Sequence, residues 1–196
     1  MLQYLVLLGA AINATGSARY IRDTLRGTTK PNRVTYLMWG IAPLIATAAA
    51  VSKGVTWAAL PIFMSGFCPM LVFISSFANR DAYWKLGALD YLCGVFSALA
   101  LIFWLITDQP AIAILLAIMS DGLAALPTLI KTWSYPETET GISYVLAFVS
   151  ASTSFAAVRH WTFVECGFAI YLVILSAALS ISVYRRKLFL MTAVAE

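Results

Sequence analysis

Charged residues are scarce in this sequence. Of its 196 residues, 11% are charged and 61% are hydrophobic. Soluble domains carry about 25% charged and about 45–50% apolar residues. A polar surface cannot be built from so few charges, so the composition argues against a soluble domain or a nucleic-acid-binding protein. It predicts an integral membrane protein whose surroundings are the lipid bilayer.

Residues that bind metals or carry redox chemistry are also few. The chain has one histidine, His160, and three cysteines inside apolar stretches, Cys68, Cys93 and Cys166. The spacing of the cysteines fits neither a metal site nor a disulfide framework. The sequence also offers no nucleophile–base set and no cofactor loop. We therefore expect no metal, no cofactor and no enzymatic activity.

Long apolar runs are what the sequence has in abundance. A helix needs about 20 mainly apolar residues to cross a bilayer. Seven such runs can be drawn, at 2–20, 34–52, 55–77, 84–106, 110–131, 141–158 and 161–184. The connections between them are short and polar, because irregular backbone is not tolerated in lipid. The sequence predicts an all-α membrane protein with seven transmembrane helices.

Basic residues are distributed unequally between the two sides of this predicted bundle. Of the 13 lysines and arginines, all but Lys53 and Arg159 fall on one side. Cytoplasmic loops carry an excess of basic residues. We therefore expect the N-terminus outside and the C-terminus in the cytoplasm, most simply in the cell (inner) membrane.

An internal repeat relates the two halves of the chain. A shift of 108 residues places the first two predicted helices on the fifth and sixth, with Asn13 on Asp121. A shift of 104 residues places the third on the seventh, and each helix crosses in the same direction as its counterpart. Two parallel three-helix repeats, 1–77 and 109–196, are thus predicted, with a linker helix at 78–108 (3+1+3).

The stretch that starts at Pro127 resembles the PQ-loop motif. Pro127-Thr128 stands where Pro-Gln is usual, and Lys131 follows at the expected spacing. Glu139 lies in the polar turn, and Ser143 opens the next helix. With the 3+1+3 layout, the chain is similar to a divergent prokaryotic-type member of the PQ-loop superfamily. That superfamily includes SWEET (MtN3) sugar transporters, lysosomal amino-acid exporters such as cystinosin, and KDEL receptors.

The resemblance implies a transporter that moves a small polar solute by alternating access, through a central cavity between the two repeats. The transport could be coupled to protons, and the unit could work alone or as a homo-oligomer. SWEETs surround their sugar with asparagines and tryptophans. The corresponding regions here read FCPML, YLVIL, ATAAA and TSFAA, so the sugar site does not carry over.

Polar side chains inside the predicted spans are the candidate site residues. Asp121 lies near the bilayer centre, where an aspartate costs about 2.5–3.5 kcal/mol on insertion scales. Asn13 lies at the same depth in the first helix. We expect both to face one central cavity, in which Asp121 binds a proton or a cationic substrate. The alternative is a carboxylate that is hydrogen-bonded between helices and has no substrate role.

Two further residues are candidates for gating. Pro127 removes a backbone hydrogen bond within the fifth helix, and we expect it to act as a hinge, with a fixed kink as the alternative. Glu165 lies one turn into the seventh helix. It could guard the outer mouth, or it could simply reach the interface or Arg159.

Asp90 and its neighbour Tyr91 lie about two turns into the linker helix. Asp90 could pair with a basic residue such as Lys85 or Lys131, and a structural role is the favoured interpretation. Both residues are secondary polar candidates.

A receptor or sorting protein of the KDEL-receptor type is the alternative function. It would bind a peptide without moving it across the membrane, and it would be expected to hold several basic residues inside its central cavity. Here the basic residues gather at the helix ends, which favours a transporter.

Overall fold

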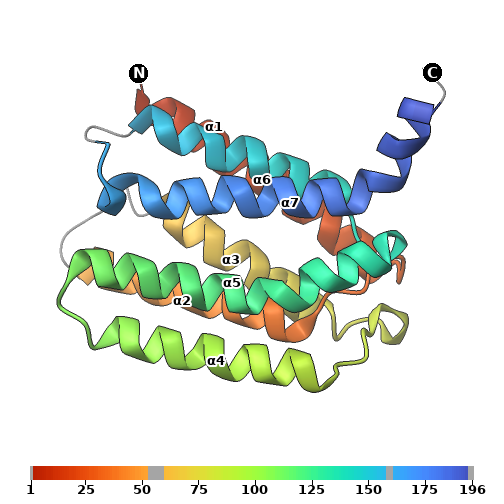
Figure 1. The fold of residues 1–196 in the computed structure, drawn as a ribbon, viewed down its shortest axis with the longest axis horizontal. Coiled ribbons are helices and arrows are strands. Elements are labelled where there is room, and N and C mark those ends of the chain that lie inside the picture. Colours follow the sequence, from red (N-terminus) through yellow and green to blue (C-terminus); the bar gives the residue numbers. More distant parts are fainter. Residues whose placement is uncertain (1, 53–59, 158–160, 194–196) are drawn as a thin grey trace.

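The computed structural model describes residues 2–52, 60–157 and 161–193. Within these ranges the chain forms seven α-helices and no strand (Figure 1), which confirms the all-α prediction. The helices are α1 (Leu2–Leu25), α2 (Arg33–Ser52), α3 (Leu60–Ser75), α4 (Ala88–Leu105), α5 (Pro110–Ser134), α6 (Gly141–Thr153) and α7 (Phe163–Ala193). Short 3-10 helices are η2 (Arg80–Ala82), η3 (Pro136–Thr138) and η4 (Ser154–Ala157).

Each predicted span overlaps one helix, but the ends differ. α1 continues five residues past the predicted end at Tyr20, and α7 continues to Ala193. Hydropathy marks where an apolar run stops, whereas a helix continues as long as its backbone bonds are made. The predicted turns at 53–54 and 159–160 lie outside the described residues.

Three helices in the described part of the chain are long and apolar enough to cross a membrane. These segments are Ala88–Leu105 in α4, Ala111–Ser134 in α5 and Cys166–Arg185 in α7. Two further apolar stretches, Phe63–Ser75 and Gly141–Ala156, are shorter. The outer face of α4 exposes large apolar side chains such as Val95, which is 57% exposed. Such a face is compatible with a lipid environment.

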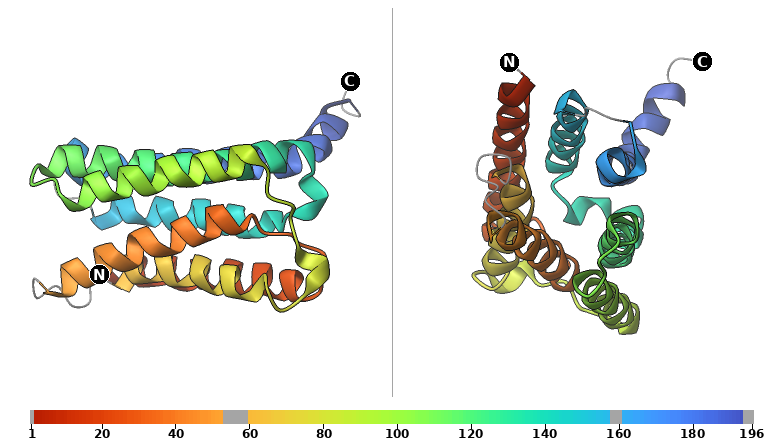
Figure 2. Two further views of the ribbon diagram at one scale, coloured as in Figure 1. Left: turned by 90° about the horizontal axis from the view of Figure 1, so that it is seen from below. Right: turned by 90° about the vertical axis from the view of Figure 1, so that its left-hand side faces the viewer.

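The helices pack in a fixed order. α3 packs against both α1 and α2, and α7 packs against both α5 and α6. The helices α1, α2 and α3 thus form one group, and α5, α6 and α7 form a second. The two groups meet along α1–α6 and along α2–α5, while α4 packs on α5 and α2. The end-on view in Figure 2 shows the six other helices arranged as a ring with α4 on its outside.

Close approach of helices within this ring depends on glycines. A Cβ added at Gly66 of α3 would lie 2.9 Å from the backbone oxygen of Gly40 on α2. A Cβ at Gly16 of α1 would lie 3.3 Å from Cα of Ser143 on α6. Small residues let helix backbones approach closely in membranes. Gly66 allows such a contact within one group of helices, and Gly16 allows one between the two groups.

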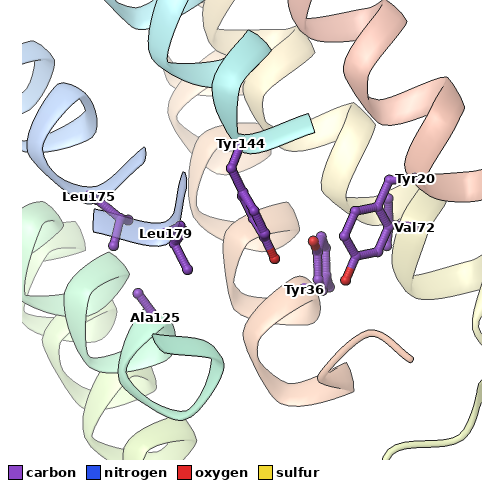
Figure 3. Packing of buried hydrophobic residues seen from close by; sticks show 7 residues of the cluster. All are labelled: Tyr20, Tyr36, Val72, Ala125, Tyr144, Leu175 and Leu179. Carbon is purple, nitrogen blue, oxygen red and sulfur yellow. The ribbon is translucent and has the colours of Figure 1, made fainter. Parts of the chain in front are cut away.

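A cluster of buried apolar residues lies toward one end of the bundle, where the connections 26–32 and 135–140 lie. We call this the Glu139 end. Figure 3 shows its cluster of buried apolar residues, which is drawn from both groups of helices. Buried polar side chains also gather there: Thr24, Thr29, Asn32, Thr35, Thr128, Lys131, Thr132, Glu139 and Thr140. Buried polar groups need hydrogen-bond partners inside the protein. The Glu139 end is therefore a candidate functional site.

Candidate functional site

The turn after α5 brings two residues of the motif together. α5 ends with the Tyr135 N–H donating to the Lys131 carbonyl at 2.7 Å, and η3 then reverses the chain. The Ser143 side chain donates to the Thr140 carbonyl at 2.6 Å in the first turn of α6. Glu139, in extended backbone just before α6, is thereby directed back toward Lys131 on α5.

Glu139 is the centre of a buried hydrogen-bonded cluster. Its Oε1 lies 2.5 Å from the Lys131 Nζ, and its Oε2 accepts hydrogen bonds from the hydroxyls of Tyr20 and Tyr144, each at 2.6 Å. The Lys131 and Glu139 side chains are only 1% and 0% exposed. A buried charge is tolerated when it is paired and hydrogen-bonded, and both oxygens of this carboxylate have partners.

Tyr36 completes the aromatic surroundings of this carboxylate. Its ring centroid lies 5.1 Å from that of Tyr20. Figure 3 shows Tyr20, Tyr36 and Tyr144 approaching one another from α1, α2 and α6. Lys131 also donates to the carbonyl of Lys30, so the cluster includes the connection between α1 and α2.

The connections 26–32 and 135–140 at the Glu139 end bond directly to each other. The Lys30 N–H donates to the Thr138 carbonyl at 3.0 Å. The Thr29 and Thr140 hydroxyl oxygens lie 2.7 Å apart, and Thr140 donates to Asp23 at 3.1 Å. The first group of helices is thus joined to the second at this end through polar contacts rather than through apolar packing alone.

A chain of threonines continues this contact into the bundle. The Thr128 hydroxyl donates to the Thr35 hydroxyl at 2.9 Å, and Thr35 donates to the Ala124 carbonyl at 2.6 Å. Thr35 lies on α2 and Thr128 on α5, and both are fully buried. Thr128, which occupies the glutamine position of the motif, therefore bridges the two groups beside Pro127. α5 runs without interruption through Pro127 to Ser134.

Asp121 lies near the middle of α5, farther from the Glu139 end. Its Oδ2 accepts a hydrogen bond of 2.7 Å from the Tyr171 hydroxyl on α7, and its carbonyl accepts one of 3.3 Å from the Trp39 indole on α2. Its side chain is half-buried. Asn13 accepts a long bond of 3.5 Å from Ser17 of its own helix. Each of the two residues thus has its own partners, and a shared cavity stays a prediction.

The remaining predicted residues differ in their surroundings, and Asp90 contacts the buried polar side chains of the Glu139 end through Asn32. Asp90 is buried, and its carboxylate accepts from the Gly87 N–H and from the Asn32 side chain, each at 2.5 Å. Within the described residues no ion pair joins it to Lys85 or Lys131, and both of its oxygens are hydrogen-bonded at the start of α4. Tyr91 is 59% exposed. The Glu165 side chain lies outside the described residues.

Sequence reasoning missed Tyr20, Tyr144 and Asn32. Tyr144 follows the motif serine directly, and it falls on Tyr36 when the repeat is aligned. That match was a usable signal, because a tyrosine hydroxyl buried in an apolar helix needs a polar partner. In the part of the chain that the structure describes, no group of three histidine, cysteine or acidic residues could hold a metal ion.

Comparison of the chain with protein-family models, with curated proteins and with solved structures returns no match. Two features of the chain itself point to a function. They are the polar contacts that join the two helix groups at the Glu139 end and the half-buried Asp121 in mid-bundle.

Proposed function

We propose that this protein is a membrane transporter of the PQ-loop type, which moves a small polar solute by alternating access between two three-helix repeats. The packing order supports the repeats. In both groups the third helix packs between the first two, giving α1–α3–α2 and α5–α7–α6. A rotation that exchanges the two repeats puts α5 in the place of α1 and α2 in the place of α6. The α1–α6 contact of one repeat with the other therefore becomes the α2–α5 contact. Two parallel copies related by an axis along the membrane normal would produce this pattern.

The single observation that carries the proposal is the polar junction between the repeats at the Glu139 end. Alternating access needs contacts that close one end of the pathway and can later separate. Hydrogen bonds such as Thr29–Thr140 and Lys30–Thr138 can exchange with water when the end opens. We propose that this junction is the cytoplasmic gate, in its closed state, with the N-terminus outside. The excess of basic residues at the Glu139 end of the bundle supports that orientation.

We further propose that Asp121 binds what the transporter carries. It lies ten residues before Lys131 on α5, which is about 15 Å along a helix. Pro127 and Thr128 lie between the two, at the contact of α5 with α2. In this proposal a solute or proton at Asp121 is separated from the cytoplasm by the threonine contact and the Glu139 cluster, and Pro127 lets the last turns of α5 move.

Transport by purified protein in proteoliposomes tests this function. Uptake of labelled amines, amino acids and sugars would be compared with and without a pH gradient. We expect at least one solute to enter faster than into protein-free vesicles, and we expect Asp121→Asn to abolish that uptake. Asp108→Asn is the matched control, since Asp108 is exposed in the connection between α4 and α5. Saturable binding of a solute that never enters the vesicles would indicate a receptor instead.

A further inference from the structure

The Asp121 carboxylate has no basic partner in the part of the chain that the structure describes. The ion pairs found there join Arg22 to Asp23 and Lys131 to Glu139. The described lysines and arginines all lie toward the Glu139 end of their helices or in its connections. A carboxylate between helices is costly without a compensating charge. The hydrogen bond from Tyr171 offsets part of this cost but brings no positive charge.

The surroundings of Asp121 are aromatic. Tyr171 of α7 and Trp39 of α2 both bond to Asp121, one to its carboxylate and one to its carbonyl. Phe168, one turn earlier on α7, has its ring centroid 5.8 Å from that of Tyr171. Trp39, Tyr171, Phe168 and Asp121 are all half-buried. A carboxylate beside aromatic rings that are not fully covered is the setting in which proteins bind organic ammonium ions.

Other ligand classes fit these residues less well. A sodium or calcium ion needs several oxygen ligands, and no acidic cluster that could hold a metal surrounds Asp121 among the described residues. A sugar needs many free hydrogen-bonding groups, whereas the Tyr171 hydroxyl and the Trp39 indole N–H already donate to Asp121. An alkylammonium ion places its charge on the carboxylate and its methyl or methylene groups against the rings.

We propose that the Asp121 site binds a singly charged alkylammonium ion, with the Asp121 carboxylate as counter-ion and the rings of Trp39 and Tyr171 beside the cation. The inference rests on the proposed function in one respect, because it names the class of solute that the transporter carries. Binding itself can be measured without any transport.

Equilibrium dialysis of the purified full-length protein in detergent micelles tests the proposal. The probes are labelled choline, ethanolamine and methylammonium. The matched neutral probe is 3,3-dimethylbutan-1-ol, which has the shape of choline without its charge. We expect at least one ammonium probe to bind saturably and the neutral alcohol not to compete. Binding of none of the three probes, or equal binding of the alcohol and choline, would overturn the proposal.

Variants separate the two parts of the site. We expect Asp121→Asn to abolish binding and Asp121→Glu to retain part of it. Trp39→Leu should weaken binding about tenfold, the size of a partly desolvated cation–π contact, and Trp39→Phe should weaken it less. Thermal unfolding of every variant shows whether the fold survives. Equal binding by folded Asp121→Asn and wild type would also overturn the proposal, whatever Trp39→Leu does.

The proposed function and this inference can fail separately. Vesicles that move a neutral solute which none of the ammonium probes inhibits would contradict the inference and leave the transporter intact. Conversely, saturable ammonium binding by a protein that moves no solute would contradict transport and leave the inference standing.

Discussion

Removal of Lys131 from the buried ion pair should lower the stability of the protein strongly. This loss should not simply add to the loss caused by removal of the Glu139 charge. Lys131→Met leaves the Glu139 carboxylate with the two tyrosine hydroxyls but without its positive charge. Because both side chains are almost fully buried, we expect a loss of about 3–5 kcal/mol in the free energy of unfolding, the usual cost of removing one partner from a buried pair. Folded domains are stable by about 5–15 kcal/mol, so the loss is a large share of the total.

The double variant Lys131→Met/Glu139→Gln removes both charges at once. The glutamine oxygen can still accept from Tyr20 and Tyr144, so no unpaired charge remains in the interior. We therefore expect the double variant to be more stable than Lys131→Met by about 2 kcal/mol or more, since a buried ion pair can often be replaced by neutral groups with little loss. The unfolding free energy would be measured by titration of dodecylmaltoside micelles with sodium dodecyl sulfate.

The exposed ion pair between Arg22 and Asp23 is the internal control. Arg22 and Asp23 approach to 3.0 Å, but the arginine side chain is 52% exposed. Exposed pairs contribute about 0–1 kcal/mol, so Arg22→Met should change stability little. The single variant Glu139→Gln completes the comparison. If the loss in Lys131→Met/Glu139→Gln equals the sum of the losses in Lys131→Met and Glu139→Gln, Lys131 and Glu139 are not energetically coupled and the reasoning is refuted.

Two further predictions concern single contacts. Tyr144→Phe removes one hydrogen bond to the buried carboxylate of Glu139 and should lower the unfolding free energy by about 1.5–3 kcal/mol in the same titration; an unchanged value would contradict the cluster. Gly66→Ala places a Cβ 2.9 Å from the backbone of α2 and should cost about 1–3 kcal/mol by overpacking. Gly122→Ala is its control, since its Cβ would lie 3.5 Å from the Tyr171 hydroxyl, an ordinary contact; an equal loss at both glycines would contradict the packing of α3 on α2.

Much of the helical layout could be predicted from the sequence. The apolar runs at 84–106, 110–131 and 161–184 correspond to the three helices with membrane-spanning length. Long apolar runs are strong signals because a bilayer demands them over about 20 residues. The helix ends were less predictable, since α1 extends beyond its apolar run into charged turns, where hydropathy carries no information on backbone hydrogen bonding.

The centre of the polar cluster could be predicted only in part. Lys131 and Glu139 were selected because they belong to a short motif, and the turn that joins them is local. Tyr20 could not be placed, because its bond to Glu139 spans 119 residues of sequence. A structural role was the favoured interpretation of Asp90, and the basic partners considered for it, Lys85 and Lys131, were chosen from charge alone. The structure instead has the Asn32 side chain and the Gly87 N–H as donors to Asp90, and the Asn32 contact spans 58 residues of sequence, which no local pattern predicts.

The most direct test of the transport mechanism is a reversible cross-link across the Glu139 end. Thr29 and Thr140 have hydroxyl oxygens 2.7 Å apart, so cysteines at both positions, in a background without Cys68, Cys93 and Cys166, should form a disulfide on oxidation. In proteoliposomes the account predicts that oxidation stops solute uptake and that a reductant restores it, because the gate can open only when the link is broken. Uptake that continues at the same rate with the disulfide fully formed would contradict alternating access through this end.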